Sequence, residues 1–165
     1  MPVSADLFRK ALSQFVSGVT VVTARGPGHT LYGMTVSSFS SVSLDPPLVL
    51  VCVDRNALSH VGIAAAGWFG VNILKEDQEH VSRLFAGPLE KWDGVETHPG
   101  PKSSAPRLDG VLVFLECRLV HTYAGGDHTI YVGQVEHAEV TEGGPLVYFR
   151  GGYGTLHHKG TKSTK

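Results

Sequence analysis

Residues 33–43 (GMTVSSFSSVS) carry six hydroxyl side chains among few apolar ones, which is unusual for a β-strand. An edge strand that faces solvent would have this composition. A strand that lines a cleft would have it as well, because hydroxyl and backbone groups offer many donors and acceptors to a heteroaromatic ligand rich in carbonyl and nitrogen sites. The composition leaves both interpretations open.

Two places carry side chains that could recognise an anion. Residues 54–59 (DRNALS) close an apolar run and open a helical segment, where free N–H groups and the helix dipole attract a phosphate. Plain capping of that helix by Asn56 or a neighbouring residue is the alternative interpretation. Arg83 is a second cationic candidate, although an arginine late in a helix also suits a surface role.

His128 follows the turn Gly125-Gly126-Asp127 at the start of a predicted strand, where it could contact a ligand or only complete the turn. None of the nine histidines has metal-type spacing to Cys or Glu, so we expect no metal ligands and no structural zinc. The sequence has no GxGxxG after its first strand and no GxxxxGK[ST], which argues against Rossmann and P-loop nucleotide sites. No supported Ser-His-Asp or Cys-His arrangement indicates acyl transfer.

The overall composition excludes several classes of protein. Fourteen basic and fifteen acidic side chains give a net charge of -1 without a basic block, so we expect no nucleic-acid partner. No window reaches the roughly 18 to 20 apolar residues of a membrane span. Cys52 and Cys117 lie in apolar runs and do not suggest a disulfide, and the N-terminal segment lacks a secretory pattern. These features predict a cytoplasmic protein without a membrane partner.

The elements that would position these residues are mostly strands. Ser4 can cap a helix whose apolar residues recur every three to four positions and which Gly18 can end. Further helices are expected at 58–66 and 76–85. Strands are expected at 19–23, 31–42, 48–53, 68–74, 111–121, 128–140 and 146–150. The continuous apolar run at 48–53 is typical of a strand buried on both faces.

Six or seven strands with few helices predict an antiparallel barrel, because closure removes the unpaired edges of an open sheet. We expect one domain over residues 1–155 and a flexible tail over 156–165, where Gly, Ser, Thr, Lys and two His gather. Residues 87–109 are expected to form a long irregular loop. Loops of this length in a compact domain are usually functional or mobile.

Several short segments, taken in order, resemble the flavin reductase-like family, which contains the small reductase components of two-component flavin-dependent monooxygenases. These segments are FRKAL (8–12), GVTVVT (18–23), residues 33–53, FGVNIL (69–74), DQ (77–78), RLF (83–85), GDHTI (126–130) and PLVY (145–148). No single segment is decisive, but their shared order is specific. The resemblance spans about residues 8–153, nearly the whole chain.

The resemblance implies a split-barrel homodimer that binds FMN or FAD at its subunit interface and uses NADH or NADPH as the hydride donor. It assigns His128 to the nicotinamide site. The residues it assigns to cofactor binding are Thr35, Val36, Ser37, Ser38, Val53, Asp54, Ser59, Arg83, Phe85 and Tyr153. Ser37 departs from the Asn or Ala common in relatives, which leaves flavin and nicotinamide preference open.

The implied activity is reduction of FMN or FAD by NAD(P)H, with supply of the reduced flavin to a partner monooxygenase. Two alternatives share the fold: an oxidoreductase that keeps its flavin tightly bound, and a non-catalytic flavin carrier. Fold alone does not decide among them. The identity of the oxygenase is not encoded in these residues.

Overall fold

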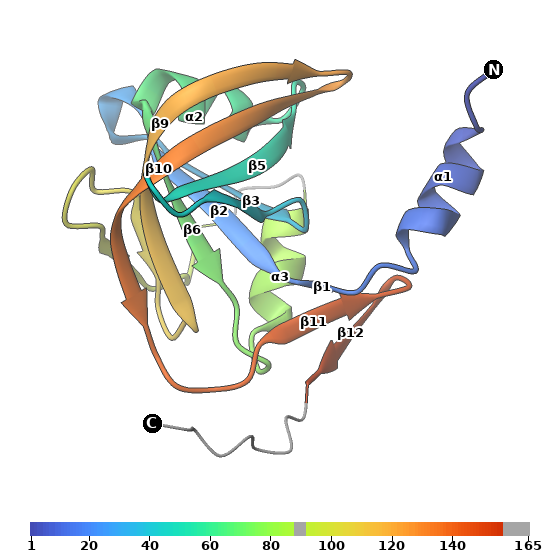
Figure 1. The fold of residues 1–165 in the computed structure, drawn as a ribbon. Coiled ribbons are helices and arrows are strands. Elements are labelled where there is room, and N and C mark those ends of the chain that lie inside the picture. Colours follow the sequence, from blue (N-terminus) through green and yellow to red (C-terminus); the bar gives the residue numbers. More distant parts are fainter. Residues whose placement is uncertain (88–91, 157–165) are drawn as a thin grey trace.

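The computed structural model describes residues 1–87 and 92–156 and shows a mainly β protein with few helices. Within this part of the chain, the main sheet has seven antiparallel strands in the order β3-β2-β6-β9-β10-β5-β4 (Figure 1). They are β2 (Thr20–Arg25), β3 (Leu31–Val36), β4 (Ser40–Ser43), β5 (Leu48–Asp54), β6 (Trp68–Ile73), β9 (Val113–Gly125) and β10 (His128–Val140). The predicted fold class, six to seven antiparallel strands with a few short flanking helices, is confirmed.

The sheet curls until strand β3, at one edge, lies close to β5. Ser38, in the link between β3 and β4, donates its hydroxyl to the carbonyl of Cys52 on β5 (2.9 Å) and accepts a bond from the Cys52 N–H (3.1 Å). This side-chain bridge takes the place of a ladder, so the barrel stays split there. The prediction of one strand over 31–42 is therefore wrong: β3 pairs with β2, and β4 turns away to pair with β5.

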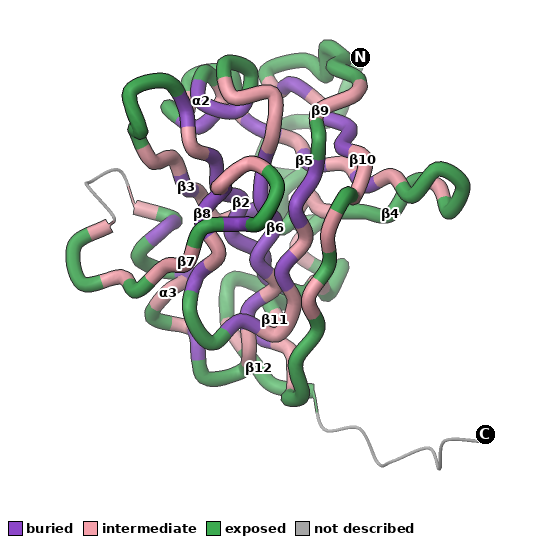
Figure 2. Tube along the Cα trace, turned by 90° about the vertical axis from the view of Figure 1, so that its left-hand side faces the viewer, coloured by how far each residue is buried: buried purple, intermediate pink, exposed green. Residues whose placement is uncertain are grey.

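The two faces of the strands belong to two separate cores. Val22 and Ala24 of β2 point into the barrel, whereas Val21 points outward, because successive side chains alternate across a strand. Phe69 and Tyr131 are the largest members of the inner core. Figure 2 shows that the buried residues follow the central strands, while most loops are exposed.

Two helices cover these cores from different sides (Figure 1). Helix α2 (Leu58–Ala66) places Ile63 in the inner core and ends at Gly67, whose φ of 66° is left-handed. Helix α3 (Glu79–Ala86) places Phe85 in the outer core. The prediction for α2 is confirmed. The predicted helix at 76–85 starts three residues later, because Gln78 closes a turn back to Lys75.

Residues 92–109 are more ordered than the sequence predicts. They contain a two-stranded hairpin of β7 (Thr97–Pro99) and β8 (Pro106–Leu108). Two barrel residues hold it: Asn72 accepts a bond from the Leu108 N–H (2.9 Å), and the fully buried Glu116 accepts one from the Ser103 N–H (2.6 Å). The expectation of an irregular loop is wrong here because both anchors are remote in sequence.

The N-terminal segment and the C-terminal strands form a smaller layer. Its strands are β1 (Ser17–Gly18), β11 (Leu146–Phe149) and β12 (Gly152–Thr155), in the order β1-β11-β12. Helix α1 (Ala5–Leu12) is capped by Ser4 as predicted, but it ends at Leu12 instead of Gly18, because Gly18 pairs with β11. Figure 1 shows α1 standing away from the barrel, and none of its residues is buried.

Two further expectations concern burial and the chain end. Strand β5 is buried on one face only: Val49, Val51 and Val53 are buried and the alternate residues are not, so the expectation of burial on both faces is wrong. Apart from Leu156, the predicted tail lies outside the described residues, as do residues 88–91.

Both cysteines are free thiols, as expected. None of the helices in the described part of the chain is long and apolar enough to cross a membrane.

Candidate functional site

The first group of predicted site residues lies where β5 ends beside the start of β10. The ladder pairs His128 with Asp54, and the Arg55 N–H donates to the Asp127 carbonyl (3.1 Å). The His128 Nδ1 lies 2.7 Å from the Asp127 carboxylate, and this hydrogen bond lowers the pKa of Asp127. The His128 imidazole is thus held through its Nδ1 atom. Its other nitrogen, Nε2, is the atom that can contact a ligand.

The hydroxyl-rich segment reaches the same end of the barrel. Ser38 is hydrogen-bonded to the main chain of Cys52, and the preceding residue, Ser37, is exposed. Val36 and Val53 are 6% and 0% exposed, so their side chains belong to the inner core, and only main-chain atoms of these two residues could meet a ligand.

The amino end of α2 adds an electropositive element. Ala57 is its N-cap and no side chain caps the helix, so the alternative of capping by Asn56 is wrong. Asn56 instead donates its N–H to the Asp54 carboxylate (2.8 Å). Ser59 lies in the first turn and is 5% exposed. An uncapped helix start attracts negative charge.

The second group surrounds α3. The Thr35 hydroxyl donates to the Ser82 carbonyl (2.7 Å), and the Ser82 hydroxyl is 2.8 Å from the Tyr153 hydroxyl. The exposed Arg83 guanidinium lies 4.9 Å from the centre of the Tyr153 ring and is paired with Glu79 (2.7 Å), whose hydrogen bond raises the pKa of Arg83. A strand hydroxyl, an aromatic ring and a cation are therefore linked through one helix.

Phe85 supports this second group from inside. Its side chain is 1% exposed and packs edge-on against Trp92, with ring centres 5.0 Å apart. A Cβ at Gly33 would lie 2.6 Å from the Phe85 ring, so glycine makes room for it. The Phe85 side chain thus fills the outer core, and its predicted part in cofactor binding stays a prediction.

Helices α2 and α3, which carry parts of the two groups, pack against β3 at different residues. Helix α2 packs on β3 at Tyr32, because Gly62 lies against that ring, whereas α3 packs at Gly33 and Thr35. Adjacent residues of a strand point to opposite faces, so the two helices lie on opposite sides of β3. The shared contact of Ser59 and Arg83 with a cofactor phosphate stays a prediction.

Several contributors were missed by reasoning from the sequence alone. Ser82, Glu79 and the main chain of Cys52 make the contacts described above. Ser82 is the neighbour of the predicted site residue Arg83, and this is the one hint of its role in the sequence. Its two partners, Thr35 and Tyr153, are far from it in the sequence. We expected no metal ligands because the sequence shows no metal-type spacing. The structure nevertheless brings Glu96, His98 and Asp109 together, which their spacing in the sequence does not show.

Comparison with known proteins places these features in a family. The model of the flavin reductase like domain matches residues 12–157. The chain is 43% identical over 150 residues to an NADH-dependent flavin reductase of Rhodococcus sp, covering 90% of this chain and 84% of that protein. It is 45% identical over 152 residues to the reductase component of 4-hydroxyphenylacetate 3-monooxygenase of Thermus thermophilus, covering 92% and 96%.

A solved structure agrees with these matches. The crystal structure of BorF, the flavin reductase component of a bacterial two-component tryptophan halogenase, superposes with a TM-score of 0.88 at 38% identity, covering 94% of this chain and all of that one. Sequence, fold and the ordered motifs agree over nearly the whole chain, and the chain belongs to the flavin reductase like domain family.

Proposed function

We propose that this protein is an NADH-dependent flavin reductase, which reduces FMN or FAD and supplies the reduced flavin to a separate oxygenase. The observation that carries the proposal is the first group: the His128–Asp127 pair, the Ser37–Ser38 link and the uncapped start of α2 meet where β5 ends. The relatives named above, an NADH-dependent flavin reductase and a monooxygenase reductase component, support it.

The residues present fit a flavin. Its ring would find hydroxyl and main-chain groups at residues 35–38 and main-chain groups at Val53 and Asp54. Its phosphate would find positive potential at the start of α2 or at Arg83. Tyr153, held by Ser82 and lying beside the Arg83 guanidinium, adds an aromatic ring to this second place. Because α2 and α3 lie on opposite sides of β3, we assign the phosphate to one of these two places, with the other left for the nicotinamide nucleotide.

A bound flavin supplies the ability to accept a hydride from the nicotinamide, which leaves as the oxidised nucleotide. The chain itself needs to hold the two rings close together and exclude water, and no dedicated acid or base is required. His128 Nε2 would donate to, or accept from, the nicotinamide amide or its ribose. Asp127 would keep the imidazole in one orientation for that contact.

We infer that the working unit is a homodimer. Support comes from α1, on which Leu7, Phe8 and Leu12 are more than half exposed, and from a groove of about 640 Å³ between α1 and Arg150. A second copy would remove this apolar surface from water. A sedimentation experiment is expected to give a dimer at micromolar concentration, and a monomer there would contradict the inference.

We also propose a cytoplasmic location, which is consistent with two free cysteines and with NADH as the reductant.

Steady-state turnover separates the reductase from its alternatives. NADH and free FMN or FAD are mixed with purified protein under air, and NADH absorbance is followed. Consumption that saturates with free flavin supports the reductase. Oxidation of only a protein-bound flavin would support an oxidoreductase that keeps its flavin, and no consumption would support a carrier.

A further inference from the structure

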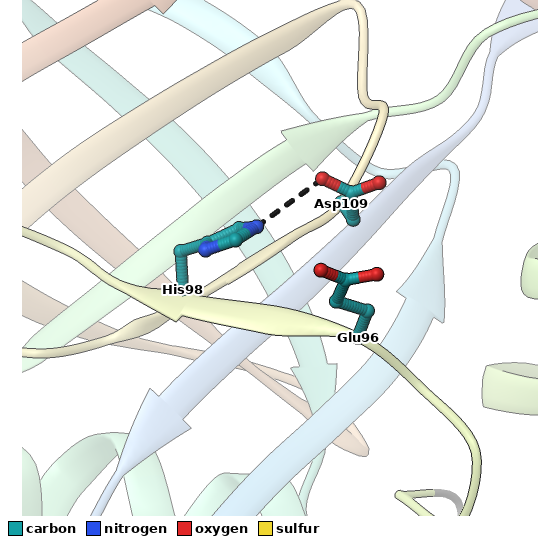
Figure 3. Close-up of side chains that lie close together, drawn as sticks. All are labelled: Glu96, His98 and Asp109. Atoms are coloured by element: carbon teal, nitrogen blue, oxygen red, sulfur yellow. Dashed lines mark hydrogen bonds and ion pairs between the residues drawn. The ribbon is translucent and has the colours of Figure 1, made fainter.

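The β7–β8 hairpin brings three metal-ligating side chains together on one face (Figure 3). Thr97 pairs with Leu108, and the Asp109 N–H donates to the Glu96 carbonyl (3.0 Å), so Glu96 and Asp109 stand opposite each other. His98 is two residues from Glu96 and therefore shares its face. The cluster arises from strand register, which sequence spacing does not show.

The ligand atoms of this cluster are close enough to share one ion. The His98 Nε2 is 3.2 Å from an Asp109 carboxylate oxygen, and one ligand atom from each of the three residues lies within 4.8 Å of the others. A tetrahedral ion with bonds of about 2.0 to 2.1 Å places its ligand atoms about 3.3 Å apart. The His98–Asp109 pair already has that spacing, and Glu96 needs only a side-chain adjustment.

The charges on this face are unbalanced. Like charges directly opposite in a ladder destabilise it. Arg107 lies opposite His98 on the same face, but it is paired with Glu139, which His137 also contacts (3.0 Å). Within residues 1–87 and 92–156, no Lys or Arg forms an ion pair with Glu96 or Asp109.

The backbone beneath the cluster is fixed from the barrel side. Asn72 accepts the Leu108 N–H (2.9 Å), and the Gln78 amide donates to the Asp109 carbonyl (2.9 Å). Leu108 itself is 2% exposed and belongs to the outer core. An ion bound here would therefore meet ligands whose main chain is already positioned, and it would fasten the hairpin at its open end.

We propose that Glu96, His98 and Asp109 bind one divalent transition-metal ion, with Zn²⁺ the best match, and that this ion stabilises the β7–β8 hairpin. An imidazole with two carboxylates suits zinc. Ca²⁺ and Mg²⁺ prefer sets made wholly of oxygen. The exposed positions of Glu96 and Asp109 leave the remaining coordination to water. The role is structural and separate from flavin reduction.

Calorimetric titration of zinc chloride into metal-stripped protein tests the site directly. His157 and His158 are replaced by Ala in every protein compared, so that this adjacent pair cannot contribute. The parent is expected to bind one zinc per chain, and His98→Ala to weaken that affinity at least tenfold. His121→Ala, which removes another exposed histidine, is the matched control and should change nothing. No binding by the parent at millimolar zinc, or equal affinity in His98→Ala, would overturn the proposal.

A second measurement uses the carboxylate repulsion and does not depend on His98. Glu96→Gln keeps the size of the side chain and removes one of the opposed charges. Without metal, Glu96→Gln is expected to melt above the parent, because repulsion is relieved. With saturating zinc the order should reverse, because the parent keeps the stronger ligand set. If Glu96→Gln melted above the parent both with and without zinc, the result would contradict the site. The melting temperature of His121→Ala should follow that of the parent in both conditions.

Discussion

The imidazole Nδ1 of His128 lies 2.7 Å from the carboxylate of Asp127, the residue before it in the chain. The Asp127 carbonyl at the same time accepts the Arg55 N–H (3.1 Å), which ties this turn to the end of β5. The histidine is therefore oriented by its own turn and by the strand next to it. This arrangement is what a residue that positions a ligand requires.

Replacement of His128 by Ala tests the nicotinamide role. The variant should lose at least ~1.4 kcal/mol of transition-state stabilisation, about tenfold in kcat/KM for NADH, because an orienting contact is lost. Flavin Kd should barely change. Steady-state kinetics and flavin titration on the same preparation check both values. If His128 only completes the turn, NADH kinetics will be normal and the melting temperature will fall modestly, and His128 then leaves the site.

Arg83→Ala tests the placement of the flavin phosphate. The variant loses a charge-assisted hydrogen bond to the phosphate, so FMN affinity should fall about tenfold while riboflavin affinity stays the same. Arg9→Ala is the matched control, because Arg9 is also exposed and paired with a carboxylate on its own helix. Equal changes in FMN and riboflavin affinity would contradict a phosphate site at Arg83 and favour one at the start of α2.

Gly33→Ala should destabilise the protein. The new Cβ would lie 2.6 Å from Phe85 and 3.0 Å from Trp92, and overpacking of this kind costs about 1 to 3 kcal/mol. Gly18→Ala is the control, because no atom lies within 4 Å of its added Cβ and it is also a strand residue. Denaturant unfolding measures both. Equal stability of the two variants would mean that Phe85 moves away freely.

The ion pair of Glu139 predicts a pH dependence of stability. Hydrogen bonding from His137 and the charge of Arg107 lower the pKa of Glu139, so the folded state holds its proton less tightly than the unfolded state. Its contribution is present above the ordinary pKa of a glutamate and is lost as the pH falls through the lowered value. Glu139→Gln should therefore be less stable than the parent at neutral pH, and the difference should shrink in acid. Unfolding curves at several pH values test this, and a difference independent of pH would contradict it.

The sequence predicts where the strands of this protein lie better than it predicts which strands pair with each other. Alternation and β-branched residues locate β2, β6 and β10, because these signals are local. The break between β3 and β4 could not be predicted, since it follows from a change of partner that only the curled sheet imposes. The β7–β8 hairpin was missed for the same reason, because its anchors come from β6 and β9.

The site shows the same division. His128 and Asp127 are adjacent in the sequence, so their turn could be found there. The contact between Ser82 and Tyr153 joins residues 71 positions apart, and no local pattern indicates it. Which face of β3 each of the helices α2 and α3 covers is a property of the assembled barrel, and no local pattern indicates it either.

The most direct test of the central claim is an anaerobic turnover experiment with a small amount of protein, excess NADH and a large excess of free FMN or FAD. A flavin reductase releases its product, so the absorbance of all the free flavin should bleach, with many flavins reduced per chain. Reduction that stops at one flavin per chain, or no reduction at all, would contradict the account.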